Sequence, residues 1–391
     1  MFSKKIVENL KNSSWIRAMF EEGNKLAKIY GRDNVYDFSL GNPFDNPPAE
    51  AIESMKKHIC ENGAHKYMSN PGYEDVRLKI AKMLQDESGV KLDANNIVMT
   101  VGAGGALNVV LKALLNPSEE VITFAPYFVE YGFYTENHGG KLVAIPADTK
   151  TFDPDLHALE NAINKKTKAI IINTPNNPTG RVYTKEHLRK MEDVIEKKEK
   201  ELGITIYVLS DQPYDKIVYD GVKVPSVLSI FKNCIVINSF SKSLGLAGER
   251  IGYAAASSNI DDIETLERAM AFTNRTLGFV NAPALFQKVA ADCLYTPCNV
   301  EAYKEKRDFL YENLTRLGFE CTKPEGAFYL FPKALMDDDV EFVKRAVKHN
   351  ILLVPGTGFG CPGYFRLSYC VDFNMIKKSI PAFEKLAEEF K

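Results

Sequence analysis

The chain has 391 residues, and this length is more than a single hydrophobic core usually holds, so it predicts two domains. Hydrophobic residues make up 45% of the chain, which is enough to fill both cores. Because its 49 basic and 51 acidic side chains nearly cancel, the composition excludes the strongly basic surface typical of proteins that bind nucleic acid or anionic membranes. No apolar run could span a membrane or form a signal peptide, and the cysteines and histidines show no metal-ligand pattern, so we expect a cytoplasmic protein with reduced thiols.

The first predicted element is an amphipathic helix from about Trp15 to Ala27. The loop Leu40–Pro48 follows, and its proline and glycine content rules out a helix or a central strand. Short β-rich runs then alternate with helix-like segments such as 185–198. The runs begin at Ile97, Val121, Ala169, Ile204, Cys234 and Gly252. This alternation predicts an α/β fold with a mostly parallel sheet flanked by helices.

The C-terminal part follows a different pattern. A long helical segment from Val300 to Leu317 precedes two strand-like segments, at 351–354 and 364–369, and a terminal helix. These elements predict a small α+β domain that the N-terminal segment would join. We therefore expect a large domain at residues 52–300 and a small domain formed by residues 1–51 and 301–391.

Small and polar residues follow several of the β-rich runs, and ligands of parallel α/β sheets bind at the carboxyl ends of strands. Gly102 to Gly104 open a helix, where small residues let backbone amides approach a phosphate, although tight packing would also explain glycines. Asp211 ends an apolar strand. An unpaired carboxylate would be costly there, so Asp211 needs a cationic partner unless it caps the next turn.

The segment from Ser239 to Gly252 carries the densest set of reactive residues. A buried, un-ionised lysine is a nucleophile for carbonyl groups, and Lys242 follows an apolar strand. Ser239 and Arg250 lie close enough in sequence to hold a phosphate beside this lysine. The combination suits a phosphorylated aldehyde cofactor bound as a Schiff base. The alternative is a solvated lysine in a loop.

Taken in order, these segments resemble the class I/II aminotransferases of fold type I, which use pyridoxal 5'-phosphate. The lysine segment 239–252 and the turn-rich segment 173–180, with the sequence NTPNNPTG, are the most specific matches. The resemblance extends from the loop of Gly41 to Arg366. It implies an α/β large domain of the fold-type I kind, with a small α+β domain formed by both ends of the chain.

The resemblance also assigns roles to individual residues. Lys242, Asp211 and Tyr214 are the expected catalytic residues, and Asp211 would pair with the protonated pyridine nitrogen. The expected cofactor-binding residues are Lys242, Gly102, Ala103, Gly104, Phe128, Asn177, Asp211, Tyr214, Ser239, Ser241, Arg250 and Tyr67. Phe128 would stack on the ring, and Asn177 and Tyr214 would share its phenolic oxygen. Gly104 stands where some family members carry a lysine that helps to select the substrate.

Three further residues are expected to bind the substrate or the neighbouring subunit. Arg366 would clamp the substrate α-carboxylate, assisted by Asn177 and by the backbone of Gly41. Tyr67 matches a tyrosine that reaches the phosphate of the neighbouring subunit, which implies a homodimer with composite sites. Ordinary buried or surface positions are the alternatives for these side chains.

The implied activity is transfer of an amino group from an L-amino acid to a 2-oxo acid, with ping-pong kinetics. Arg275 lies near the place where some aspartate aminotransferases present an arginine to the distal carboxylate, although a surface arginine fits equally well. We expect aspartate or glutamate as the donor and aromatic amino acids next. The alternative activity is that of a carbon–sulfur β-lyase acting on cystathionine, which would use the same lysine, aspartate and arginine. A DNA-binding regulator is disfavoured, because the residues before Gly41 are too few for a winged-helix extension.

Overall fold

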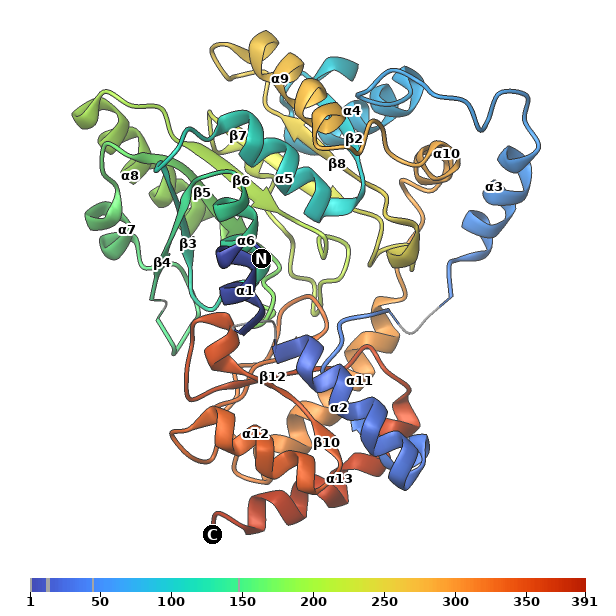
Figure 1. Cartoon of the computed structure of the whole chain (residues 1–391), viewed down its shortest axis with the longest axis vertical. Helices are drawn as coiled ribbons and strands as arrows, with labels where there is room; N and C mark the ends of the chain where they lie inside the picture. The colour runs from blue at the N-terminus through green and yellow to red at the C-terminus, as the bar shows by residue number, and fades with distance from the viewer. Residues whose placement is uncertain (1, 12–14, 44–45, 147) are drawn as a thin grey trace.

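A seven-stranded sheet forms the centre of the larger part of the molecule (Figure 1). The structure is a computed structural model and describes residues 2–11, 15–43, 46–146 and 148–391. In spatial order the strands are β2 (Ile97–Thr100), β8 (Gly252–Ala256), β7 (Cys234–Ser239), β6 (Tyr207–Asp211), β5 (Thr167–Asn173), β3 (Glu120–Phe124) and β4 (Lys141–Ile145). β8 runs antiparallel to β2 and β7, and the other neighbours are parallel. The predicted mostly parallel α/β sheet is confirmed.

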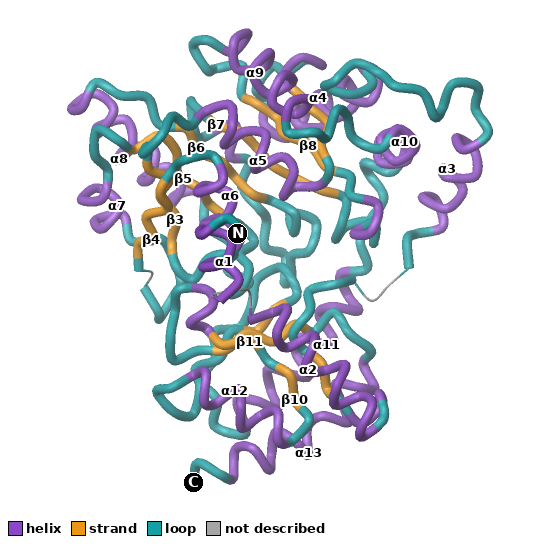
Figure 2. The backbone as a smooth tube through the Cα atoms, in the orientation of Figure 1, coloured by secondary structure: helices purple, strands orange, loops and turns teal. Residues whose placement is uncertain are grey.

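Helices lie on both faces of this sheet, as Figure 2 shows. In β5, Ile170 and Ile172 belong to the apolar cluster that includes α8 (Lys185–Leu202), whereas Ile171 belongs to the cluster that includes α5 (Gly102–Leu114). All three isoleucines are at most 1% exposed. A strand buried on both faces is apolar throughout, which is why these runs were recognisable in the sequence.

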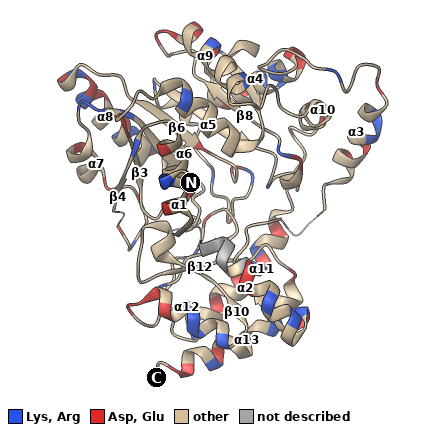
Figure 3. Ribbon diagram, in the orientation of Figure 1, with Lys and Arg blue, Asp and Glu red and all other residues tan. Residues whose placement is uncertain are grey.

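The remaining helices of this part surround the sheet. They are α3 (Ala49–Ile59), α4 (Glu74–Ser88), α6 (Glu130–Asn137), α7 (Leu156–Ala162), α9 (Ile263–Thr276) and α10 (Ala284–Asp292). Figure 3 shows residues of both charges along outer helices such as α3 and α8. None of the helices in the described ranges is both long and apolar enough to cross a lipid bilayer.

A smaller group of strands lies at the other end of the molecule (Figure 1). β9 (Tyr329–Leu330), β11 (Val354–Pro355) and β12 (Phe365–Ser368) form one antiparallel sheet, and β1 (Tyr36–Asp37) pairs in parallel with β10 (Ile351–Leu352). The helices α2 (Trp15–Tyr30), α11 (Val300–Arg316), α12 (Asp339–Lys348) and α13 (Phe373–Glu388) pack around these strands. The β1–β10 pair brings the N-terminal segment to the C-terminal part, while the exact domain boundaries stay a prediction.

Two details differ from the sequence-based expectation. The strand-like segment 351–354 is divided at Leu353 into β10 and β11, which pair with different partners. The edge strand β4 was not predicted, because its half-exposed residues lack the continuous apolar character of the central strands. In the predicted loop Leu40–Pro48, Phe44 and Asp45 lie outside the described residues.

Candidate active site

A pocket lies at the carboxyl ends of the central strands. β2, β3, β5, β6 and β7 run in the same direction, because β8 is antiparallel to both of its neighbours. Their ends therefore meet at one edge of the sheet, as expected for a ligand site of an α/β fold. Twelve of the residues predicted from the sequence line this pocket: Gly41, Ala103, Gly104, Phe128, Asn177, Asp211, Tyr214, Ser239, Ser241, Lys242, Arg250 and Arg366.

Lys242 follows β7 and reaches toward the N-terminal loop. Its Nζ donates a hydrogen bond to the carbonyl oxygen of Gly41 at 2.5 Å and lies 5.7 Å from the centre of the Phe328 ring. Burial, together with the positive charges of Arg366 and Arg250, lowers the pKa of this amine to about 8, although Cys370 opposes the shift. A substantial fraction of the amine is thus neutral at slightly alkaline pH, which is the form that attacks a carbonyl group.

Asp211 ends β6 and is 5% exposed. Its Oδ2 accepts a hydrogen bond of 2.6 Å from the hydroxyl of Tyr131, while its Oδ1 is buried without a hydrogen-bond partner in the described part of the chain. Burial raises the pKa of this carboxyl to about 6, although the bond from Tyr131 opposes the shift. A buried carboxylate oxygen that lacks a partner fits a cationic ligand group, such as a protonated pyridine nitrogen.

The part of the pocket near Arg250 is suited to an anion. Gly102 begins α5 with a φ of +77°, and a Cβ on it would come within 2.6 Å of Nη2 of Arg250. The guanidinium of Arg250 therefore lies against the N-terminus of α5, and Ser239 and Ser241 line the same pocket. Backbone amides at a helix N-terminus, an arginine and two hydroxyls together fit a phosphate. The residues present thus fit both the pyridine nitrogen and the phosphate of a phosphorylated pyridine cofactor.

Arg366 is 2% exposed, belongs to β12 and lines the same pocket as Asp211. Its Nη1 donates to Oδ1 of Asn177 at 3.0 Å and its Nη2 donates to the carbonyl oxygen of Ser39 at 2.6 Å. Its Nε is buried and has no hydrogen-bond partner among the described residues. A buried guanidinium with one donor unused fits the carboxylate of a small-molecule substrate.

Two tyrosines that contact pocket residues were not predicted from the sequence. The hydroxyl of Tyr329 lies 2.8 Å from that of Tyr214, and its ring lies 4.6 Å from the guanidinium carbon of Arg366. Tyr131, which contacts Asp211, stands three residues after Phe128. Nothing in the sequence separates such tyrosines from ordinary core aromatics. The position of Tyr131 three residues after the predicted ring-stacking Phe128 could have pointed to it.

Two predicted residues lie away from the pocket of their own chain. Tyr67 is 88% exposed and lines a separate hollow with Asn281 and Pro283. Arg275 is exposed on α9 and stacks over the ring of Phe272 at 5.2 Å. Tyr67 was expected to act in the neighbouring subunit, so its position in a single chain does not test that role. Both roles stay predictions.

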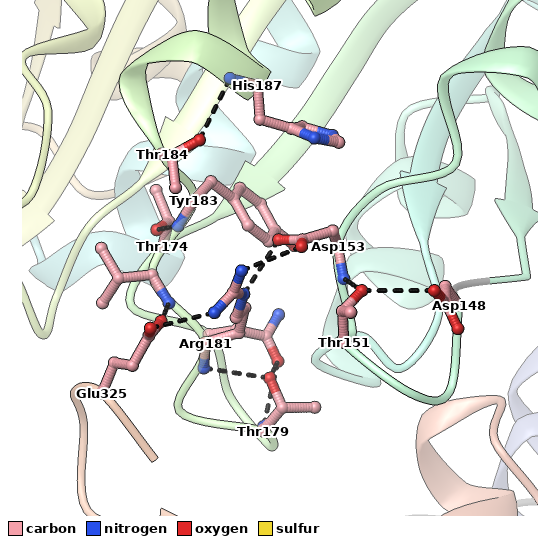
Figure 4. Close-up of polar contacts among 12 residues, drawn as sticks. Asp148, Thr151, Asp153, Thr174, Thr179, Arg181, Tyr183, Thr184, His187 and Glu325 are labelled. Carbon is pink, nitrogen blue, oxygen red and sulfur yellow. Dashed lines mark hydrogen bonds and ion pairs between the residues drawn. The ribbon is translucent and has the colours of Figure 1, made fainter. Parts of the chain in front are cut away.

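The loop that carries Asn177 is held by a charged cluster around Arg181, shown in Figure 4. The guanidinium of Arg181 donates two bonds of 2.9 Å to Asp153 and one of 2.9 Å to Glu325. The other oxygen of Glu325 accepts from the backbone of Val182 at 3.0 Å. Arg181 thus joins the loop after β5 to the segment before α7 and to the turn that leads into β9.

We expect Arg181→Ala to lower the free energy of unfolding by about 1–3 kcal/mol, because two half-buried carboxylates would lose their charged partner. The variant should also raise the KM for the amino donor, since Asn177 is four residues away on the same loop. Urea unfolding and steady-state kinetics measure both effects. Arg181→Lys is the matched control. It keeps the charge without the paired bonds to Asp153, and an unchanged stability in the alanine variant would contradict the bracing role.

Comparisons with known proteins identify the family to which the chain belongs. The family model described as "Aminotransferase class I and II" matches residues 33–383. A "Probable aspartate aminotransferase" from Methanocaldococcus jannaschii is 34% identical over 90% of this chain and 93% of its own, and an "Aspartate aminotransferase" from Thermotoga maritima is 32% identical over 92% and 93%. The crystal structure of an amino transferase from Eubacterium rectale is similar at a TM-score of 0.96 and 44% identity, covering 100% of both chains.

Matches of this extent, together with the order of the strands, place the protein among the fold-type I enzymes of the pyridoxal-phosphate class. The chain belongs to the aminotransferase class I and II family. It is therefore a transaminase, as the sequence predicted.

Proposed function

We propose that this enzyme transfers the amino group of aspartate or glutamate to a 2-oxo acid, with pyridoxal phosphate held at Lys242. The observation that carries the proposal is the placement of a partly neutral lysine, an unpartnered carboxylate oxygen of Asp211 and an unused donor of Arg366 around one pocket. When bound, the cofactor supplies an electron sink for the α-carbon of the amino acid.

Side chains of the protein bind the substrate, orient it and move the proton. Arg366 binds the α-carboxylate and, with the backbone of Gly41, orients the α-carbon toward Lys242. The amine of Lys242 takes the α-proton and returns it, which requires its neutral form. Asn177 and Tyr214 would hold the cofactor ring from the pocket wall, and the buried carboxylate of Asp211 would favour a protonated pyridine nitrogen. Donor and acceptor use the site in turn, so ping-pong kinetics follow.

The preference for acidic donors rests on the relatives, which are named as aspartate aminotransferases. Arg275 is the proposed contact for a distal carboxylate, and from its exposed position it would act in a neighbouring subunit. The exposed Tyr67 supports the same homodimer with composite sites. We also propose the domain boundaries given above and a cytoplasmic location.

A screen of the first half-reaction tests this function. The purified holoenzyme is mixed with each L-amino acid in turn, without an oxo acid, and the visible absorbance of the cofactor is followed. Aspartate and glutamate should give the fastest change and leave the corresponding oxo acid, with aromatic amino acids next. Release of pyruvate and ammonia from cystathionine without amino-group transfer would instead favour the β-lyase.

The same screen on Arg275→Ala tests the distal contact. Loss confined to acidic donors would support it, and an unchanged profile would remove Arg275 from the site. Arg268→Ala is a matched control, because Arg268 is another exposed arginine of α9.

A further inference from the structure

Tyr134 is a pocket residue to which neither the sequence motifs nor the family assignment gives a role. It belongs to α6, three residues after Tyr131, so the two side chains lie on the same face of the helix. Tyr131 contacts Asp211, whereas Tyr134 lines the corner formed by Ala103, Gly104 and Arg250. α6 therefore directs one tyrosine to each end of the candidate cofactor site.

The hydroxyl of Tyr134 occupies space that exists because residue 104 is glycine. A Cβ on Gly104 would lie 2.9 Å from this hydroxyl oxygen, closer than nearly all carbon contacts in folded proteins, and 3.6 Å from the ring carbon that bears it. Gly104 also stands at the position where some members of the family carry a lysine. In this chain, a neutral hydroxyl occupies the space beside the backbone that such a side chain would need.

This hydroxyl has the character of an unused hydrogen-bond donor. It makes no hydrogen bond with another residue of the described ranges, and the side chain is partly buried. Burial, together with the carboxyls of Glu130 and Asp211, raises the pKa of Tyr134 to about 12, although Arg250 opposes the shift. The hydroxyl therefore keeps its proton at physiological pH, and Arg250 is near enough to act on it.

We propose that the hydroxyl of Tyr134 donates a hydrogen bond to the phosphate of the cofactor, in addition to the N-terminus of α5 and Arg250. The inference rests on the proposed function, since it requires pyridoxal phosphate in this pocket. A phosphate placed against the first turn of α5 and the guanidinium of Arg250 lies in the corner that this hydroxyl faces. A neutral donor there adds a hydrogen bond to a dianion without adding a further buried charge.

Affinity for two ligands that differ only in the phosphate tests the contact directly. Apoenzyme is titrated with pyridoxal phosphate and with pyridoxal by isothermal titration calorimetry. Tyr134→Phe should weaken the affinity for pyridoxal phosphate roughly tenfold, as expected for a lost hydrogen bond to a charged group, and should leave the affinity for pyridoxal unchanged. Tyr127→Phe is the matched control, because Tyr127 is also partly buried and does not line the pocket.

Gly104→Ala provides a second and independent variant. The added methyl group should displace the hydroxyl and weaken the binding of pyridoxal phosphate in the parent enzyme, but it should have little effect in the Tyr134→Phe background, where the nearest ring carbon is at contact distance. Equal losses for both ligands, no loss for either, or additive effects of the two substitutions would overturn the inference. A changed KM for the amino donor with unchanged cofactor affinity would place the hydroxyl on the substrate instead. Failure of the parent apoenzyme to bind pyridoxal phosphate would refute the proposed function itself.

Discussion

Lys242→Ala is expected to lower the transamination rate by at least about 10⁴-fold, because the amine of Lys242 is the group that we propose moves the α-proton. The loss should arise from chemistry rather than from unfolding. Burial lowers the pKa of Lys242 to about 8, which means that the folded chain disfavours the charged amine. Removing it should therefore leave the apoprotein at least as stable at pH 7 as the parent.

Steady-state kinetics, cofactor absorbance after dialysis and borohydride labelling with peptide mapping measure this result. The parent should be labelled at Lys242, and the alanine variant should bind the cofactor only reversibly. Lys242→Arg separates charge from proton transfer, because arginine keeps the positive charge and does not deprotonate. Transamination retained by either variant, or a label on another residue, would contradict the assignment.

The central sheet could be predicted from its apolar runs, and a few pocket residues from the polar positions that follow them, whereas the resemblance to a known family supplied the other pocket residues. The strands β5, β6 and β7 are covered on both faces, so they appear as unbroken apolar runs, and a polar residue at the end of such a run is conspicuous. Asn173, Asp211 and Ser239 each end one of these strands and line the pocket.

The supporting residues could not be predicted, since their role depends on which element packs against which. Tyr131 and Tyr329 are at most 2% exposed and resemble core aromatics in any sequence pattern, yet one contacts Asp211 and the other Tyr214. The bracing role of Arg181 depends in the same way on Asp153 and Glu325, which are distant in sequence. Tertiary contacts of this kind leave no local periodicity.

Charged groups without full compensation connect stability with function in this pocket. Asp211 and Arg366 are both almost fully buried, and each leaves one polar atom without a hydrogen-bond partner among the described residues. Such atoms destabilise an empty site and become favourable once a ligand of complementary charge is bound. A substitution that removes the charge should therefore affect the apoprotein and the loaded enzyme in opposite directions.

Asp211→Asn is expected to show this opposition most clearly. The pKa of Asp211 rises from its ordinary value of 3.8 to about 6, which corresponds to about 3 kcal/mol of folding free energy when the carboxyl is ionised. Because the folded state holds the proton more tightly than the unfolded state, this carboxyl makes the apoprotein less stable as the pH rises from about 4 to about 6. Asparagine does not ionise, so the Asp211→Asn apoprotein avoids this loss of folding free energy. Above pH 6 it should be more stable than the parent by up to about 3 kcal/mol, and at lower pH the difference should be smaller.

The loaded enzyme should show the reverse order. Without the carboxylate, the pyridine nitrogen loses its charged partner, and we expect weaker cofactor binding and a fall in kcat/KM of roughly 10²-fold or more, as for other broken buried charge pairs. Denaturant unfolding of the apoproteins between pH 4.5 and 8, with and without added pyridoxal phosphate, measures the crossover. Glu192→Gln is the control: burial raises the pKa of this carboxyl on α8 to about 7, so its removal should stabilise the chain while activity stays unchanged. An apo Asp211→Asn variant no more stable than the parent at pH 7.5 would show that the Asp211 carboxylate is already compensated before the cofactor binds.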